Sequence, residues 1–79
     1  MARLRVLSGR EVCRILSAHG FVEVRRRGSH IAMQKRDAER TTTVPVPDDR
    51  ELRVGTLMSI IRQSGVPRSE FEVRSHGRR

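Results

Sequence analysis

The sequence contains few aromatic residues: it has no tryptophan and no tyrosine, and its two phenylalanines are Phe21 and Phe71. Many domains that bind single-stranded RNA or DNA, the RRM among them, stack bases on exposed aromatic rings. Such a stacking platform is absent here. Any nucleic-acid partner is therefore expected to be contacted through its sugar-phosphate backbone.

Cysteine is also scarce, and there is no long apolar segment. Cys13 is the one cysteine in the sequence, so an intramolecular disulfide is excluded, which fits a reducing cytoplasm. One cysteine and three scattered histidines give no metal-ligand spacing, and the sequence predicts neither a metal site nor another cofactor. No apolar run approaches the roughly 20 residues that span a bilayer, and the N-terminus lacks a signal-peptide stretch. We expect a soluble cytoplasmic protein with no membrane association.

Positive charge is what the sequence has in excess. Lysine and arginine number 17 against 9 acidic residues, which gives a formal net charge of +8. At 79 residues we expect a single domain over 1–79, with a core from about 7 to 72 and a basic, disordered tail over 74–79. A domain of this size buries roughly 60% of its unfolded surface. A polyanion is the default partner, and RNA, DNA and acidic proteins all qualify.

The most distinctive stretch is Arg25-Arg26-Arg27-Gly28-Ser29-His30, between two segments that favour β-strand. Arginine stays charged and offers a planar set of donors that matches phosphate oxygens. Glycine allows a positive φ and a close approach of phosphate to the backbone, and serine adds a hydroxyl donor. Histidine titrates near neutral pH, so it can transfer a proton. These residue types suffice for metal-free phosphodiester chemistry, although a solvated turn with a structural histidine has the same composition.

A first helix is predicted to begin after Ser8 and to end at Gly20. Ser8 and Glu11 have the spacing of a capping box. Cys13 is expected to be a small, partly buried filler in this helix. Helical spacing places four residues on one face, which predicts an amphipathic helix: Val12, Ile15, Leu16 and, in the last turn, His19.

Three strands are predicted next, over residues 21–25, 29–35 and 40–46. The arginine stretch forms the first turn, and a second charged turn follows the middle strand. Because side chains alternate along a strand, Ile31 and Met33 are expected to face one way and His30 the other. His30 is thus predicted on the polar face, away from the core. Pro45 has no N–H to donate, so the third strand is predicted at an edge of the sheet.

A second helix is predicted to begin around Val54 to Thr56, with Thr56 as its cap, and to end at Gly65. A further helical turn is expected from Pro67 to Phe71. The order helix, three strands, helix predicts an α+β fold of the double-stranded-RNA-binding-domain type. Its arrangement is α-β-β-β-α, with both helices on one face of a three-stranded antiparallel sheet.

Several short motifs stand in a specific order along the chain: Gly20-Phe21, Arg25, Gly28-Ser29-His30, Val44-Pro45, Glu51-Leu52, Gly55-Thr56-Leu57 and Ile60-Ile61-Arg62-Gln63. In order and approximate spacing they resemble the HicA (YcfA-like) family of bacterial toxins, from about Leu7 to Phe71. Two positions depart from the family pattern. Met33 stands where many relatives have an aromatic residue, and Pro47 stands where many have a histidine.

The resemblance implies an mRNA interferase, the toxin of a type II toxin–antitoxin system. Such a protein is an endoribonuclease that cleaves mRNA in the bacterial cytoplasm, inhibits translation and growth, and is neutralised by a HicB-type antitoxin, here with an acidic surface. The family's catalytic histidine matches His30. The candidates for holding RNA phosphates are Arg25, Arg26, Arg27, Gly28 and Ser29.

The expected mechanism is metal-independent and uses the 2′-OH of the RNA as nucleophile, with His30 as general base. Two other functions have the same fold and charge. One is a non-catalytic module of the double-stranded-RNA-binding type, in which His30 only contacts phosphate or 2′-OH. The other is a basic docking protein for an acidic partner.

Overall fold

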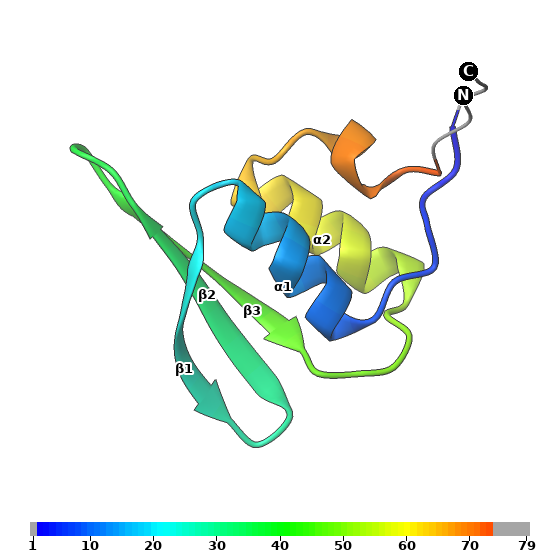
Figure 1. Cartoon of the computed structure of the whole chain (residues 1–79), viewed down its shortest axis with the longest axis horizontal. Coiled ribbons are helices and arrows are strands. Elements are labelled where there is room, and N and C mark those ends of the chain that lie inside the picture. Colours follow the sequence, from blue (N-terminus) through cyan, green and yellow to red (C-terminus); the bar gives the residue numbers. More distant parts are fainter. Residues whose placement is uncertain (1, 74–79) are drawn as a thin grey trace.

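The computed structural model describes residues 2–73, and the basic tail expected over 74–79 lies outside them. Figure 1 shows two helices packed side by side against a small sheet. The elements in chain order are α1 (Gly9–Ala18), β1 (Val22–Arg27), β2 (His30–Arg36), β3 (Thr41–Pro47), α2 (Val54–Ser64) and the 3-10 helix η1 (Arg68–Phe71).

The sheet is antiparallel in the order β1-β2-β3, so β2 is the central strand and β3 an edge strand, as predicted from Pro45. The buried side chains of the sheet all belong to one face, and both helices pack on that face (Figure 1). The predicted α+β arrangement is therefore confirmed. The sheet contributes to the hydrophobic core through Ile31, Met33, Val44 and Val46.

Helix α1 begins where the capping box predicts. The Glu11 backbone N–H donates to Ser8 Oγ at 3.1 Å, and the Ser8 backbone N–H donates to Glu11 Oε1 at 2.8 Å. Two of the unpaired donors at this end of the helix are thereby satisfied. The helix ends at the expected place, because Gly20 adopts a φ of 95° that leads the chain away towards β1.

The first hairpin differs from the prediction. The strand was expected to end at Arg25, with Arg26 and Arg27 in the turn, but both residues belong to β1 and pair with Ile31 and His30 of β2. The turn consists of Gly28 and Ser29 alone, with Gly28 at a φ of 57°. Two-residue turns with a positive φ match the twist of antiparallel strands, so the hairpin needs no longer loop. The arginines are left to extend the strand.

Helix α2 ends at Gly65, as predicted, with a φ of 73°. It begins at Val54, within the predicted range, but its cap is not Thr56. The cap residue is Arg53, which makes no side-chain capping hydrogen bond within the described part of the chain, and Thr56 already lies inside the first turn. The short turn after Pro67 is η1, and its Phe71 is fully buried. Among residues 2–73, no helix has the length and apolar character to cross a membrane.

The two ends of the described chain lie beside each other, as Figure 1 shows at its upper right. Leu4 and Glu72 form an antiparallel bridge. The Arg5 N–H donates to the Phe71 carbonyl and the Val73 N–H to the Arg3 carbonyl, each at 2.8 Å. These ends lie on the far side of the helices from the β1–β2 turn (Figure 1).

Candidate functional site

His30 is the first residue of β2 and is exposed. Its neighbour Ile31 is buried, as is Met33, so His30 points away from the helices, as the alternation of the strand predicts. Across the sheet it lies between Arg27 of β1 and Pro47 of β3. The imidazole is therefore reachable by a large ligand.

The three arginines of β1 divide between the two faces of the sheet. Residues directly opposite each other in an antiparallel pair have side chains on the same face. Arg27 pairs with His30 and Arg25 with Ala32, so both lie on the face of His30. Arg26 pairs with the buried Ile31 and lies on the helix side.

A β-bulge determines this division. The register shifts between Glu23 and Arg25, so that Glu23 faces Met33 while Arg25 faces Ala32. A bulge inserts one residue and reverses the alternation beyond it. Without the bulge, a strand aligned at Glu23 would turn Arg25 and Arg27 towards the helices. No glycine or proline marks this position, so the bulge could not be predicted from the sequence.

We call the uncovered side of the sheet the open face. By cross-strand pairing and alternation, it consists of Val22, Arg25 and Arg27 of β1; His30, Ala32, Gln34 and Arg36 of β2; and Thr41, Thr43, Pro45 and Pro47 of β3. Within the three strands the one acidic residue is Glu23, which is on the helix side. The open face is therefore cationic around His30, with no carboxylate from the strands to offset it.

Asp48 ties the tip of the hairpin to the rest of the protein. Its carboxylate accepts a hydrogen bond from Arg26 and pairs with Arg10 of α1 at 3.4 Å, and its backbone N–H donates to the Ser29 carbonyl at 2.6 Å. The side chain is 18% exposed. The hydrogen bond from Arg26 is the main cause that holds the pKa of Asp48 below its ordinary value. Asp48 therefore joins β1, the turn before His30 and α1.

Helix α1 can approach this segment closely because its first residue is a glycine. A Cβ atom on Gly9 would lie 1.9 Å from the Pro47 carbonyl oxygen, well inside contact distance. The Gly9 N–H donates to the Asp49 carbonyl at 2.9 Å. The start of α1 thus rests directly on the backbone that follows β3. Because Pro47 pairs with His30 of β2, the contact with α1 also holds the hairpin tip in place.

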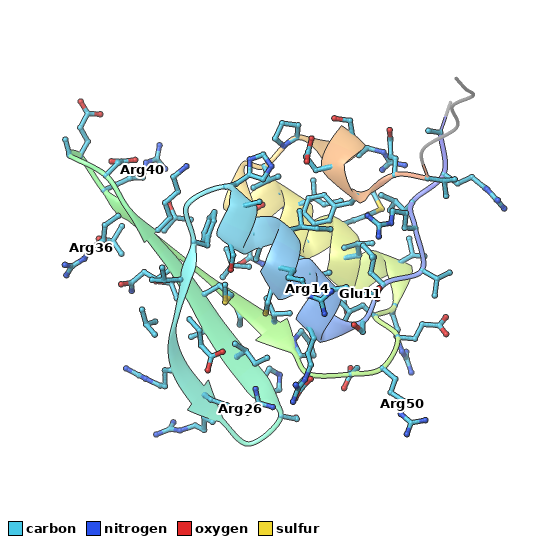
Figure 2. The ribbon with its side chains drawn as sticks, viewed as in Figure 1. Glu11, Arg14, Arg26, Arg36, Arg40 and Arg50 are labelled. Atoms are coloured by element: carbon cyan, nitrogen blue, oxygen red, sulfur yellow. The ribbon has the colours of Figure 1, made fainter. Side chains whose placement is uncertain are left out.

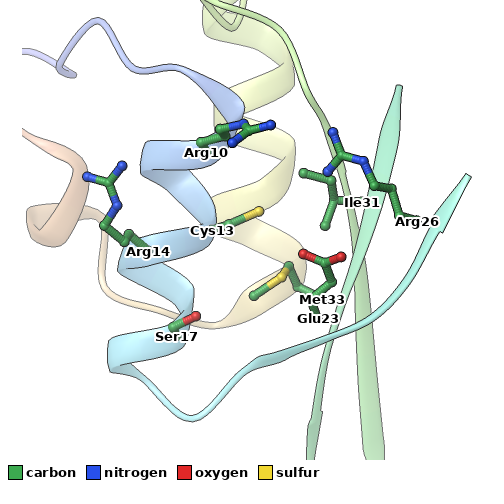
Figure 3. Close-up of a pocket in the computed structure, with 8 residues that line it drawn as sticks. All are labelled: Arg10, Cys13, Arg14, Ser17, Glu23, Arg26, Ile31 and Met33. Carbon is green, nitrogen blue, oxygen red and sulfur yellow. The ribbon is translucent and has the colours of Figure 1, made fainter. Parts of the chain in front are cut away.

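A hollow of about 340 Å³ lies on the helix side of the same hairpin, between α1 and β1 (Figure 3). Arg26 points into the space between the two elements, and Cys13 is partly buried there, as predicted. Burial is the main cause that raises the pKa of the Cys13 thiol. The residues that line the hollow are Arg10, Cys13, Arg14, Ser17, Glu23, Arg26, Ile31 and Met33.

The candidate residues found from the sequence are thus partly brought together. His30, Arg25 and Arg27 share the open face, and Gly28 and Ser29 form the turn beside them. Arg26 is separated from this group by the sheet. Asp48 was missed, because its importance depends on a strand register that places it beside a turn 19 residues earlier in the chain. Between residues 2 and 73, no group of three histidine, cysteine or acidic side chains is arranged to hold a metal ion.

Fold and site define a small, basic α+β protein that presents a histidine beside two arginines on an uncovered sheet face. The profile of the family described as the HicA toxin of bacterial toxin–antitoxin systems matches residues 9–66, from the start of α1 to just beyond α2. The chain belongs to this family, which confirms the resemblance seen in the sequence, and membership implies an antitoxin partner. No curated protein matches the chain.

Proposed function

We propose that this HicA-family protein is an mRNA interferase, a toxin that arrests translation and growth by cutting mRNA with His30. The observation that carries the proposal is the exposed imidazole at the hairpin tip, with Arg27 directly opposite it and Arg25 on the same face. A base with two permanent cations on the same face suits a reaction in which a phosphodiester gains negative charge.

The reaction we propose needs groups from the RNA and from this chain alone. His30 accepts the proton of a ribose 2′-OH, and the 2′-oxygen attacks the adjacent phosphorus. The bond from phosphorus to the 5′-oxygen of the next nucleotide then breaks, and that oxygen leaves with a proton from the His30 imidazolium. The products are a 2′,3′-cyclic phosphate and a 5′-hydroxyl end.

Rate acceleration is shared between His30 and the arginines. General acid–base catalysis contributes about 10² to 10⁴ in rate. Arg25 and Arg27, with the backbone near Gly28 and Ser29, are the candidates for holding the phosphate and stabilising its added charge. Arg26 acts indirectly in this scheme, because its guanidinium binds Asp48 on the other side of the sheet.

The partners follow from this chemistry. The substrate is mRNA, and the setting is the bacterial cytoplasm. The antitoxin is of the HicB type and presents carboxylates to the cationic open face, because such a surface both speeds encounter with a +8 protein and competes with phosphate.

A cleavage assay with purified protein tests the proposal. RNA should be cut in the presence of excess chelator, and the 5′ fragments should end in a 2′,3′-cyclic phosphate or in the 3′-phosphate formed from it. His30→Ala should reduce cleavage at least 10²-fold. Because His30 is exposed, the variant leaves no cavity and should keep the wild-type circular dichroism spectrum and Tm.

Two results would contradict the proposal. One is undiminished cleavage by the His30→Ala protein, and the other is cleavage that requires magnesium and leaves a 3′-hydroxyl end. A non-catalytic RNA-binding module is the second candidate function. One observation favours it: Pro47, the residue opposite His30 on β3, has no group that transfers a proton. It predicts RNA binding without cleavage by the wild-type protein.

A further inference from the structure

The open face extends well beyond His30. Since β2 rises about 3.3 Å per residue, the six steps from His30 to Arg36 cover about 20 Å. Arg36 is exposed at the far end of the sheet from the β1–β2 turn, as Figure 2 shows, and it alternates onto the same face as His30. The face therefore carries cations at both ends.

The side chains between these cations are uncharged, and two of the four, Gln34 and Thr43, are polar. Ala32 and Gln34 of β2 lie beside Thr43 and Pro45 of β3, and the Gln34 side-chain amide donates to Thr43 Oγ1 at 3.1 Å. Amide and hydroxyl groups of this kind bind phosphate oxygens and ribose hydroxyls. None of the four side chains is an aromatic ring on which a base could stack.

The cations on the helix side are less suited to a polyanion. Arg10 and Arg26 share the carboxylate of Asp48. Lys35 of β2, the one lysine of the sequence, turns towards the helix side, where its Nζ lies 5.9 Å from the centre of the Phe21 ring. The arginines of the open face contact no carboxylate of the strands.

We propose that the open face is a track for single-stranded RNA, which runs from the hairpin tip at Arg25, Arg27 and His30 to Arg36 at the other end of β2. The proposal rests on the cleavage function proposed above. It adds Arg36 as a phosphate-binding residue and Gln34 and Thr43 as contacts to the sugar-phosphate backbone. Because the contacts are to the backbone, the track reads little base sequence.

The RNA is single-stranded because of the reaction. Attack by the 2′-oxygen requires that oxygen, the phosphorus and the leaving 5′-oxygen to lie nearly in line. The regular backbone of an A-form duplex holds them away from that line, whereas a single strand can rotate into it. A face without deep grooves also matches an extended strand better than a duplex.

The track can be tested by binding alone. The probe is a mixed-sequence, fluorescently labelled single-stranded oligoribonucleotide, and the background is the full-length His30→Ala protein, so that the probe is not cut. Arg36→Gln and Arg25→Gln are compared with Arg62→Gln. Arg62 is an exposed arginine of α2 whose guanidinium contacts Ser59 of its own helix at 3.5 Å.

We expect Arg36→Gln and Arg25→Gln each to weaken binding several-fold. Each should also reduce the slope of log K against log salt by about 0.7, the contribution of one phosphate on a single strand. Arg62→Gln should change the affinity and the salt slope only by the small amount that losing one unit of net charge anywhere on the protein would cause. A duplex of the same sequence should compete poorly for the bound probe.

Several results would contradict the proposal that the open face is a track for single-stranded RNA. Equal effects of Arg36→Gln and Arg62→Gln would mean that RNA binds by net charge only. Tighter binding of the duplex would remove the single-stranded assignment. If Arg36→Gln weakened antitoxin binding and left RNA binding unchanged, this end of the face would be a protein interface. If the wild-type protein cut no RNA but the binding slopes were as expected, the track would stand and the cleavage function would fall.

Discussion

The carboxylate of Asp48 is the point at which the hairpin tip, α1 and the chain after β3 meet. Its pKa is lower in the folded protein than in the unfolded chain, with the hydrogen bond from Arg26 as the main cause. The ionised carboxylate therefore stabilises the fold above about pH 4, the ordinary range of an aspartate. This stabilisation is lost as the pH falls below that range, towards the lowered pKa.

Asp48→Asn keeps the size of the side chain and the backbone N–H to Ser29, but removes the charge. The variant's free energy of unfolding should fall less steeply with acidification below about pH 4 than that of the wild type. At neutral pH, the looser hairpin tip should lower RNA cleavage. Urea unfolding across this pH range and a cleavage assay measure the two effects.

Glu11→Gln is the matched control for Asp48→Asn. The pKa of Glu11 is also lowered, chiefly by the hydrogen bond from the Ser8 backbone, and a glutamine preserves the capping box. This variant should flatten the same pH dependence without changing cleavage at neutral pH. Equal losses of cleavage in both variants would show that Asp48 acts through overall stability and not through the hairpin tip.

At the residue scale, the sequence predicted correctly those features that depend on the spacing of residues within one helix or strand. The capping box of Ser8 and Glu11 and the outward side of His30 each follow from spacing within a few residues. It did not reveal which face Arg26 occupies, because that depends on a bulge, or the role of Asp48, whose partner Arg26 is 22 residues away. Such contacts depend on the register of two strands, which no short window of sequence contains.

At the scale of elements, the packing of α1 against the end of β3 depends on the missing side chain of Gly9. Gly9→Ala places a Cβ atom against the Pro47 backbone, which cannot rotate away as a flexible side chain could. The better helix propensity of alanine is outweighed, and we expect a loss of about 1–3 kcal/mol in the free energy of unfolding. Urea denaturation measures it.

Gly55→Ala is the control at this scale. Gly55 lies in the first turn of α2, and apart from its chain neighbours and the nearby backbone of its own helix, no heavy atom of the described residues is within 4 Å of the Cβ position. Alanine should therefore stabilise the protein by up to about 1 kcal/mol through helix propensity. If Gly9→Ala proved equally stabilising, the close approach of α1 to Pro47 would be wrong.

The elements themselves were predictable because their patterns are strong. The apolar stripes of the two helices and the β-branched run of β3 lie where the sequence indicates. The arginines were assigned to a turn because polar clusters usually form loops, but backbone pairing with β2 extends the strand to Arg27. Thr56 was taken as a cap because of its residue type, while the helix begins two residues earlier, at Val54.

At the scale of the whole molecule, toxin activity and antitoxin binding should depend on the same charged face. Arg27 lies opposite His30 on the open face. Arg27→Glu should therefore weaken RNA cleavage and the binding of a HicB-type antitoxin together, and unlabelled antitoxin should displace RNA from the His30→Ala protein. Cleavage rates and surface plasmon resonance measure the two activities.

Arg62→Glu on α2 carries the same change of charge on a different element and should have much smaller effects. Arg26→Glu is not a suitable control, because it also removes the partner of Asp48. An Arg27→Glu protein that lost cleavage and bound antitoxin with unchanged affinity and on-rate would show that the antitoxin docks elsewhere. Direct competition would then have to be abandoned.

The pairing of Leu4 with Glu72 also bears on the order in which the protein folds. It joins parts of the chain that are almost as far apart as the described sequence allows. Closing so long a loop costs conformational entropy, so this contact is expected to form late in folding. Phe71, which is fully buried, belongs to the same late segment. During synthesis, the hairpin with His30 emerges from the ribosome long before the residues that close the core. A nascent toxin therefore lacks its complete fold until the segment that contains Phe71 and Glu72 has left the ribosome.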